Sequence, residues 1–208
     1  MDIQPDGAFL FDMDGTLVDS TSVVEQLWLD WSDSHGLDYS SIIAVAHGRR
    51  DVDVIQEVAP WLDAEEEAIW ILNEELKRTH GLKAVPGAAR LLSNLDPAKW
   101  AVVTSASDEL ARMRLGAANL PVPPVLVSAE DVSVGKPDPQ GYLLAAARLG
   151  CDIRHSIVFE DTVAGLTAGS VAGASAVLVK ATAAARTIEW PASIRDFRDD
   201  RLRLSRKL

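Results

Sequence analysis

Two aspartates near the N-terminus, Asp12 and Asp14, are spaced so that their side chains can act together. They follow the apolar residues 8–11, a run that predicts a buried strand. Residues two apart on an extended chain point the same way, so both carboxylates project beyond the end of this strand. Two like charges held this close repel each other unless a cation or a shared proton intervenes. The pair therefore indicates a divalent metal site, an acid/base role, or both.

Three further predicted strands, at 99–105, 125–127 and 156–159, also lead into polar side chains. Each polar group alone is typical of a helix cap or a surface loop. In a parallel α/β sheet, however, ligands bind beyond the carboxyl ends of the strands, so the groups are expected to meet at one edge. They are Thr104 and Ser105, Lys136 in the loop after the second strand, and Glu160 with Asp161.

The elements that must position these groups alternate between strands and helices. Helices are predicted at 86–95, 107–118, 138–150 and 162–172, and a last core strand at 176–179. Alternation at this spacing predicts a parallel sheet with right-handed crossovers. The fold class is therefore α/β, with a Rossmann-like parallel-sheet core.

The segment 19–82 contains no clear strand and predicts an all-helical insertion. One helix is expected from Ser20 or Thr21 to a stop at Gly36, another from Asp51 or Asp53 to Pro60, and a third or fourth over 64–77. Glu74 and Glu75 are interpreted as a solvated helix face. The predicted domains are a core of residues 1–18 and 83–208 and a helical domain of residues 19–82. No structure is predicted for the tail 190–208.

Composition excludes several classes of function. The net charge of −11 and the pI of about 4.7 argue against nucleic acid or an anionic membrane as a partner. The single cysteine, Cys151, allows neither a disulfide framework nor a cysteine-based zinc site. No stretch approaches the roughly 20 apolar residues of a membrane span, and no signal peptide is visible, so a cytoplasmic protein is expected.

The motifs resemble those of the haloacid dehalogenase superfamily, in order and in spacing. Residues 12–16 read Asp-Met-Asp-Gly-Thr, residues 135–139 read Gly-Lys-Pro-Asp-Pro, and residues 159–162 read Phe-Glu-Asp-Thr. Thr104 occupies the place of the second motif. The helical insertion after the first motif resembles the family's α-helical cap domain, so the resemblance covers nearly the whole chain.

This resemblance implies a chemistry and assigns roles to the residues. Asp12 would be the nucleophile that forms an aspartyl-phosphate, and Asp14 the acid that protonates the leaving alcohol and then the base that activates water. Thr104 and Lys136 would bind and neutralise the phosphoryl group. A Mg²⁺ ion would bind the Asp12 carboxylate, the Asp14 backbone carbonyl and Asp161, with Glu160 acting through a water. Because dehalogenase relatives lack the second aspartate, Asp14 favours phosphate esters.

Short segments further resemble the glycerol-phosphate and 2-deoxyglucose-6-phosphate phosphatases. They imply a Mg²⁺-dependent phosphatase acting on a small sugar or polyol phosphate, as a monomer or weak homodimer. His47 and Arg50 of the insertion, with Ser105, are the predicted substrate contacts. One alternative is a β-phosphoglucomutase-like enzyme, which shares the core motifs. Another is a non-catalytic phosphosugar-binding protein, which would not need a nucleophile.

Overall fold

The computed structural model describes residues 7–199. Residues 200–208 of the tail 190–208 lie outside this range. Six parallel strands form the central sheet in the order β5-β4-β1-β6-β7-β8. The chain builds outward from β1 to β5 and then returns to the other side of β1, so the strand order reverses at β1. Ligands of open α/β sheets bind at such a reversal. The strands are β1 (Phe9–Phe11), β4 (Trp100–Val103), β5 (Leu126–Val127), β6 (Ile157–Glu160), β7 (Ser175–Val179) and β8 (Ser193–Ile194).

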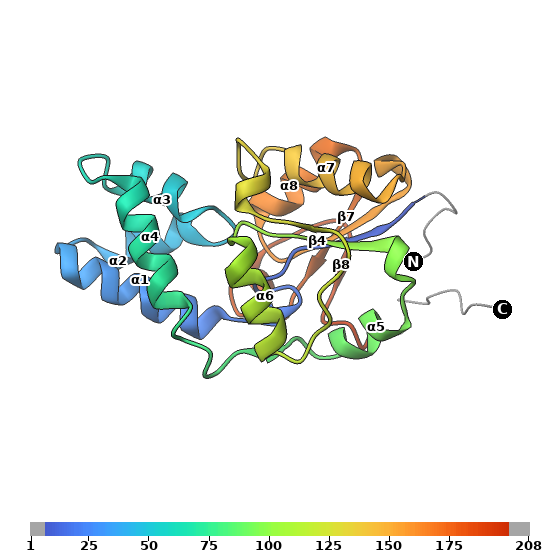
Figure 1. Cartoon of the computed structure of the whole chain (residues 1–208), viewed down its shortest axis with the longest axis horizontal. Helices are drawn as coiled ribbons and strands as arrows, with labels where there is room; N and C mark the ends of the chain where they lie inside the picture. Colours follow the sequence, from blue (N-terminus) through green and yellow to red (C-terminus); the bar gives the residue numbers. More distant parts are fainter. Residues whose placement is uncertain (1–6, 200–208) are drawn as a thin grey trace.

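Helices cover both faces of this sheet, which explains why its strands are apolar throughout rather than alternating. In Figure 1, α7 and α8 lie above the sheet and α5 and α6 below it. Leu10 of β1 belongs to the cluster with α7 and α8, whereas Phe9 and Phe11 belong to the opposite cluster. The Phe11 ring stacks on Phe159 with centroids 5.0 Å apart. These helices are α5 (Ala88–Asn94), α6 (Asp108–Ala117), α7 (Gln140–Leu149) and α8 (Val163–Ala172).

Several predicted helix ends are confirmed by side-chain hydrogen bonds or by backbone conformation. The Ser107 hydroxyl accepts a hydrogen bond from Leu110 N–H at the start of α6, 3.2 Å away. Gly36 and Gly150 both adopt the left-handed conformation that ends their helices. Asp138 accepts from Gln140 N–H at the start of α7, at 2.9 Å. The α/β fold class predicted from the sequence is confirmed.

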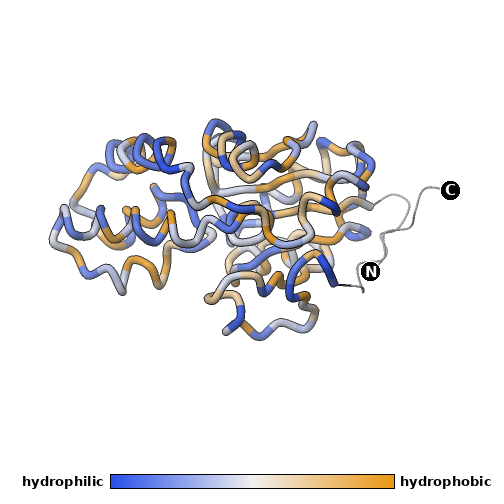
Figure 2. Tube along the Cα trace, turned by 90° about the horizontal axis from the view of Figure 1, so that it is seen from below, coloured by the Kyte–Doolittle hydropathy of each residue, from blue (hydrophilic) through white to orange (hydrophobic). Residues whose placement is uncertain are grey.

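The four helices of the insertion form a separate body at the left of Figure 1, away from both termini. They bury an apolar cluster of their own, which includes Leu27, Trp31 and Ile71. Figure 2 shows the corresponding alternation of hydrophobic and hydrophilic turns along these helices. The helices are α1 (Thr21–His35), α2 (Tyr39–Ala46), α3 (Asp51–Val58) and α4 (Ala64–Glu75).

Two features of the insertion and one of the tail differ from the sequence predictions. Helix α2 was missed because it spans only eight residues, too few for its run of apolar side chains to show a helical period. The Asp38 side chain caps it by accepting from Ser40 and Ser41 N–H. The insertion also joins the core through a short antiparallel pair, β2 (Val18–Asp19) with β3 (Lys83–Ala84). In the tail, β8 adds an edge strand to the sheet beside β7.

Among residues 7–199, no helix is both long enough and apolar enough to cross a membrane. The helical insertion faces the carboxyl ends of the strands. Its residues therefore form part of the surroundings of the polar side chains that follow these strands.

Candidate active site

Asp12 lies directly after β1, at the centre of the sheet. Its backbone N–H donates to the Phe159 carbonyl at 2.9 Å, which extends the pairing of β1 with β6 by one residue. The chain then turns back at once, because Gly15 adopts a φ of 82° and its N–H donates to the Val18 carbonyl at 2.7 Å. This tight loop holds Asp12 and Asp14 at the sheet edge, as their spacing predicts.

Lys136 is the cation at the centre of the cluster. Its ammonium donates to Asp12 Oδ1 at 2.6 Å, to Glu160 Oε1 at 2.7 Å and to the Val103 carbonyl at 3.1 Å. All three donor positions of the ammonium are therefore used. Burial opposes the charge, but the Asp12 and Glu160 carboxylates outweigh it and raise the pKa of Lys136 well above its usual range. Lys136 stays charged and holds the nucleophile candidate in place.

Glu160 is fully buried, and protein donors already occupy both of its oxygens. Besides Lys136, the Tyr142 hydroxyl donates to Oε1 at 3.1 Å. The other oxygen, Oε2, accepts from the Asp161 and Thr162 backbone N–H groups and from the Thr162 hydroxyl. A Cβ on Gly165 would lie 1.6 Å from Oε1, so only glycine leaves room for this carboxylate. Glu160 therefore positions Lys136 and the loop that follows β6.

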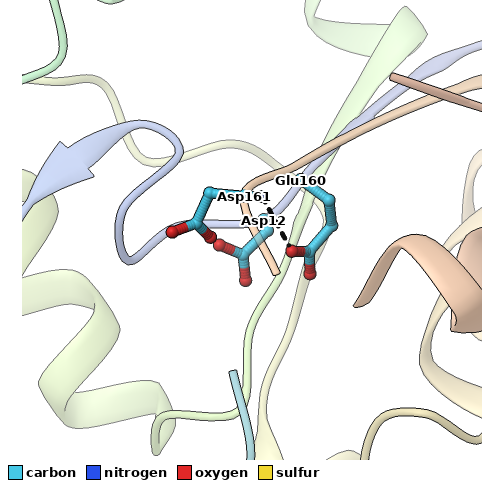
Figure 3. A group of neighbouring side chains, drawn as sticks. All are labelled: Asp12, Glu160 and Asp161. Atoms are coloured by element: carbon cyan, nitrogen blue, oxygen red, sulfur yellow. Dashed lines mark hydrogen bonds between the residues drawn. The ribbon is translucent and has the colours of Figure 1, made fainter. Parts of the chain in front are cut away.

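The carboxylates of Asp12, Glu160 and Asp161 offer oxygens that lie within 4.8 Å of one another, close enough for a shared cation (Figure 3). The dashed line in Figure 3 marks the bond from Asp161 N–H to Glu160, which fixes the two neighbours relative to each other. Hard divalent cations take such oxygen ligands. Because protein donors already saturate Glu160, Asp12 and Asp161 are the carboxylates that fit a metal best.

The electrostatics of this group also favour a cation. Burial, with the negative charge of Glu160, raises the pKa of Asp12 to about 7 even though Lys136 acts in the opposite direction. Burial and the Asp12 charge raise the pKa of Asp161 well above its usual range. Three carboxylates facing one ammonium carry excess negative charge, and a divalent cation would neutralise it.

Asp14 has partners that the sequence analysis missed. The Ser20 hydroxyl donates to its Oδ1 at 2.6 Å, and Arg114 donates to its Oδ2 at 2.8 Å. The same guanidinium donates to Glu75 Oε1 at 2.5 Å. Arg114 is 3% exposed and Glu75 is 5% exposed, so the interpretation of Glu75 as a solvated residue is wrong. Arg114 was detectable, because it follows Leu110 and Ala111 at helical spacing on the buried face of α6.

Six of the nine predicted site residues line a cavity of about 80 Å³ between the sheet edge and the helical insertion. Thr104 lies there, and its hydroxyl accepts from Ala106 N–H at 3.1 Å. Ser105 donates instead to the Gly48 carbonyl of the insertion at 2.9 Å, so it ties the insertion to the core. The cavity brings together the predicted Asp12, Asp14, Thr104, Ser105, Asp161 and His47 and adds Trp28, Asp51, Glu75 and Arg114, among others.

Arg50 does not line this cavity. Its guanidinium forms a two-pronged pair with Asp53, at 2.7 and 2.8 Å, and reaches toward the Val132 carbonyl at 3.4 Å. It lines a smaller neighbouring cavity of about 20 Å³ that Lys136 and Thr104 also line. The structure thus places Arg50 beside the phosphoryl-binding candidates and apart from His47.

Comparisons with known proteins agree with this arrangement. A model of the haloacid dehalogenase-like hydrolases matches residues 7–173. Hexitol phosphatase A of Escherichia coli is 41% identical over 180 residues, which are 84% of this chain and 83% of the relative. The chain belongs to the haloacid dehalogenase-like hydrolase family. Glycerol-1-phosphate phosphohydrolase 1 of Saccharomyces cerevisiae is 35% identical to this hydrolase over 188 residues, 84% of this chain and 75% of the relative.

A crystal structure of a hydrolase from Pseudomonas syringae superimposes on this hydrolase with a TM-score of 0.79, at 26% identity and with 94% and 95% of the two chains covered. The family resemblance predicted from the motifs is confirmed. So is the prediction of an enzyme, a phosphoric monoester hydrolase, since these curated relatives are themselves named phosphatases or phosphohydrolases.

Proposed function

We propose that this hydrolase is a Mg²⁺-dependent phosphatase of small sugar or polyol phosphates that works through an aspartyl-phosphate on Asp12. The observation that carries the proposal is the juxtaposition of Asp12, Lys136 and Asp161 at the sheet edge, beside a cavity that also contains Asp14. Relatives named hexitol phosphatase A and 2-deoxyglucose-6-phosphate phosphatase 1 support the substrate class.

In the first step, an oxygen of the Asp12 carboxylate attacks phosphorus, and the bond between phosphorus and the alcohol oxygen breaks. Asp14 donates a proton to the leaving alcohol oxygen. In the second step, Asp14 takes a proton from a water that attacks the phosphorus. The acyl-phosphate bond then breaks, and inorganic phosphate leaves with Asp12 restored.

The surrounding residues stabilise the transferring group. Lys136 keeps the Asp12 oxygen fixed and offsets its charge, and the Thr104 hydroxyl can donate to a phosphoryl oxygen. Asp12, Asp161 and the Asp14 backbone carbonyl would hold Mg²⁺, which would supply positive charge beside the phosphoryl oxygens. Residues 19–82 would act as a cap over the core residues 1–18 and 83–208, and closing such a lid excludes water from the site.

The test is a phosphate-release screen with purified protein, with and without Mg²⁺. Sugar phosphates, polyol phosphates, phosphoglycolate and nucleotides are compared with p-nitrophenyl phosphate. We expect Mg²⁺-dependent release that is fastest for sugar or polyol phosphates. Equal release after exhaustive chelation, or none from any ester, would contradict the proposal.

A further inference from the structure

The part of the cavity beyond the phosphoryl site carries two carboxylates that the proposed reaction does not use. Asp51 lies at the first position of α3, and Glu75 is the last residue of α4, so both come from the insertion. Both line the cavity, together with the apolar side chains of Val24 and Trp28. A leaving group attached to the phosphate would therefore meet carboxylate oxygens beside an apolar surface.

The cations that line this cavity are already paired or uncharged. Arg114 is bound between Asp14 and Glu75, at 2.8 and 2.5 Å. Arg49 pairs with Glu57, which lies outside the cavity, at 2.7 Å. Burial lowers the pKa of His47, which favours the neutral imidazole. Among the described residues, the part of the cavity that would hold the leaving group therefore contains no unpaired cation that could bind an anion.

Asp51 has unused hydrogen-bonding capacity. Within residues 7–199, no protein donor bonds to its carboxylate, although the side chain is half-buried and lines the cavity. Burial raises the pKa of Asp51 well above its usual range, and the neighbouring Glu75 charge raises it further. The same Glu75 charge would repel an anionic ligand placed beside Asp51.

We infer that Asp51 and Glu75 determine substrate specificity by accepting hydrogen bonds from the hydroxyls of a neutral polyol or sugar leaving group and by rejecting leaving groups that carry a carboxylate or a second phosphate. The inference rests on the proposed phosphatase function and deepens it. A hydroxyl donates to a carboxylate, whereas an ionised carboxylate or phosphate can only accept and would leave the Asp51 oxygens without a donor. A site built to bind a hydroxyl strongly rejects a ligand that leaves its buried polar groups unpaired.

The experiment compares two esters that differ at one end only. Hexitol 6-phosphate ends in CH₂OH, and the matching six-carbon aldonate 6-phosphate ends in a carboxylate. kcat/KM is measured for both with Mg²⁺ at pH 7.5, for the wild type and for Asp51→Asn and Glu75→Gln. The ratio of the two values within each variant cancels differences in folded fraction. Glu74→Gln is the matched control, because Glu74 lies on the same helix but pairs with Lys77 outside the cavity.

We expect the wild type and Glu74→Gln to favour the hexitol ester by at least about 30-fold, from the selectivity that an unpaired group confers. This ratio should fall at least about fivefold in Asp51→Asn and in Glu75→Gln. Because Glu75 also binds Arg114, Asp51→Asn is decisive if Glu75→Gln folds poorly. A wild-type ratio near one, or a ratio unchanged in Asp51→Asn, overturns this inference while the phosphatase function stands. Absence of activity on either ester and on p-nitrophenyl phosphate overturns the function and the inference with it.

Discussion

Replacing Arg114 with methionine tests the charged contact that joins the core to the insertion. Arg114 comes from α6 of the core, and its guanidinium binds Glu75 of the insertion and Asp14 of the active-site loop. Methionine keeps most of the side-chain length but removes the charge. Glu75, at 5% exposure, is then left as a buried carboxylate without its partner. Removing one member of a buried pair costs about 3–5 kcal/mol.

The contribution of Asp14 to this loss is smaller, because its side chain is 27% exposed and water can solvate it; pairs at such positions contribute about 0.2–1 kcal/mol. We therefore expect Arg114→Met to lower the free energy of unfolding by about 3–5 kcal/mol, a large share of the usual 5–15 kcal/mol. Glu75→Gln should cost about 1.5–3 kcal/mol, since the amide still accepts from Arg114. In the double variant, the neutral amide at position 75 needs no cation, so the losses should fall short of their sum by at least about 1 kcal/mol.

The assay is urea unfolding followed by tryptophan fluorescence and circular dichroism together, because coincident curves show that the core and the insertion unfold as one unit. The matched control is Arg112→Met on the same helix. Arg112 pairs with Asp108 at the surface, so this change should cost no more than about 0.5 kcal/mol. Strictly additive losses in the double variant, or a loss below about 1 kcal/mol in Arg114→Met, would refute the role assigned to the contact.

Three further outcomes are expected. Asp12→Asn should abolish turnover without unfolding the protein, and activity within about tenfold of wild type would exclude the covalent step. Gly165→Ala should displace Glu160 from Lys136, costing about 1–3 kcal/mol and most activity, whereas Gly116→Ala, with no atom within 4 Å of the new Cβ, should not destabilise. Burial raises the pKa of Asp12 to about 7 in the folded, metal-free protein. Between about pH 4 and pH 7 the folded state therefore holds a proton on Asp12 that the unfolded chain has lost, so the contribution of Asp12 to the free energy of unfolding falls as the pH rises through this range. Mg²⁺ binding at pH 6 should then release protons, which calorimetry in two buffers of different ionisation enthalpy detects; no release would contradict this.

The sequence alone determined the sheet edge of the site. The chemistry there is local to short motifs: the two-residue spacing of Asp12 and Asp14 aligns their side chains, and the glycine that follows allows the turn. Apolar runs buried on both faces identify parallel strands, and parallel strands deliver their ends to one edge. The sequence alone could therefore predict that Lys136 and Asp161 lie beside Asp12, and the structure has them there.

Only the tertiary structure decided what the insertion contributes. The distance from Glu75 to Arg114 along the chain is 39 residues, and helical spacing says which face of a helix is buried but not which helix it meets. Glu75 lies next to Glu74 in an acidic helix, and only the contact with Arg114 makes one of them buried while the other pairs with Lys77 at the surface. Arg50 illustrates the same limit, since its pairing with Asp53 removes it from the cavity that His47 lines. Active-site chemistry followed from short-range spacing, whereas the surroundings of the leaving group follow from how two separately packed bodies meet.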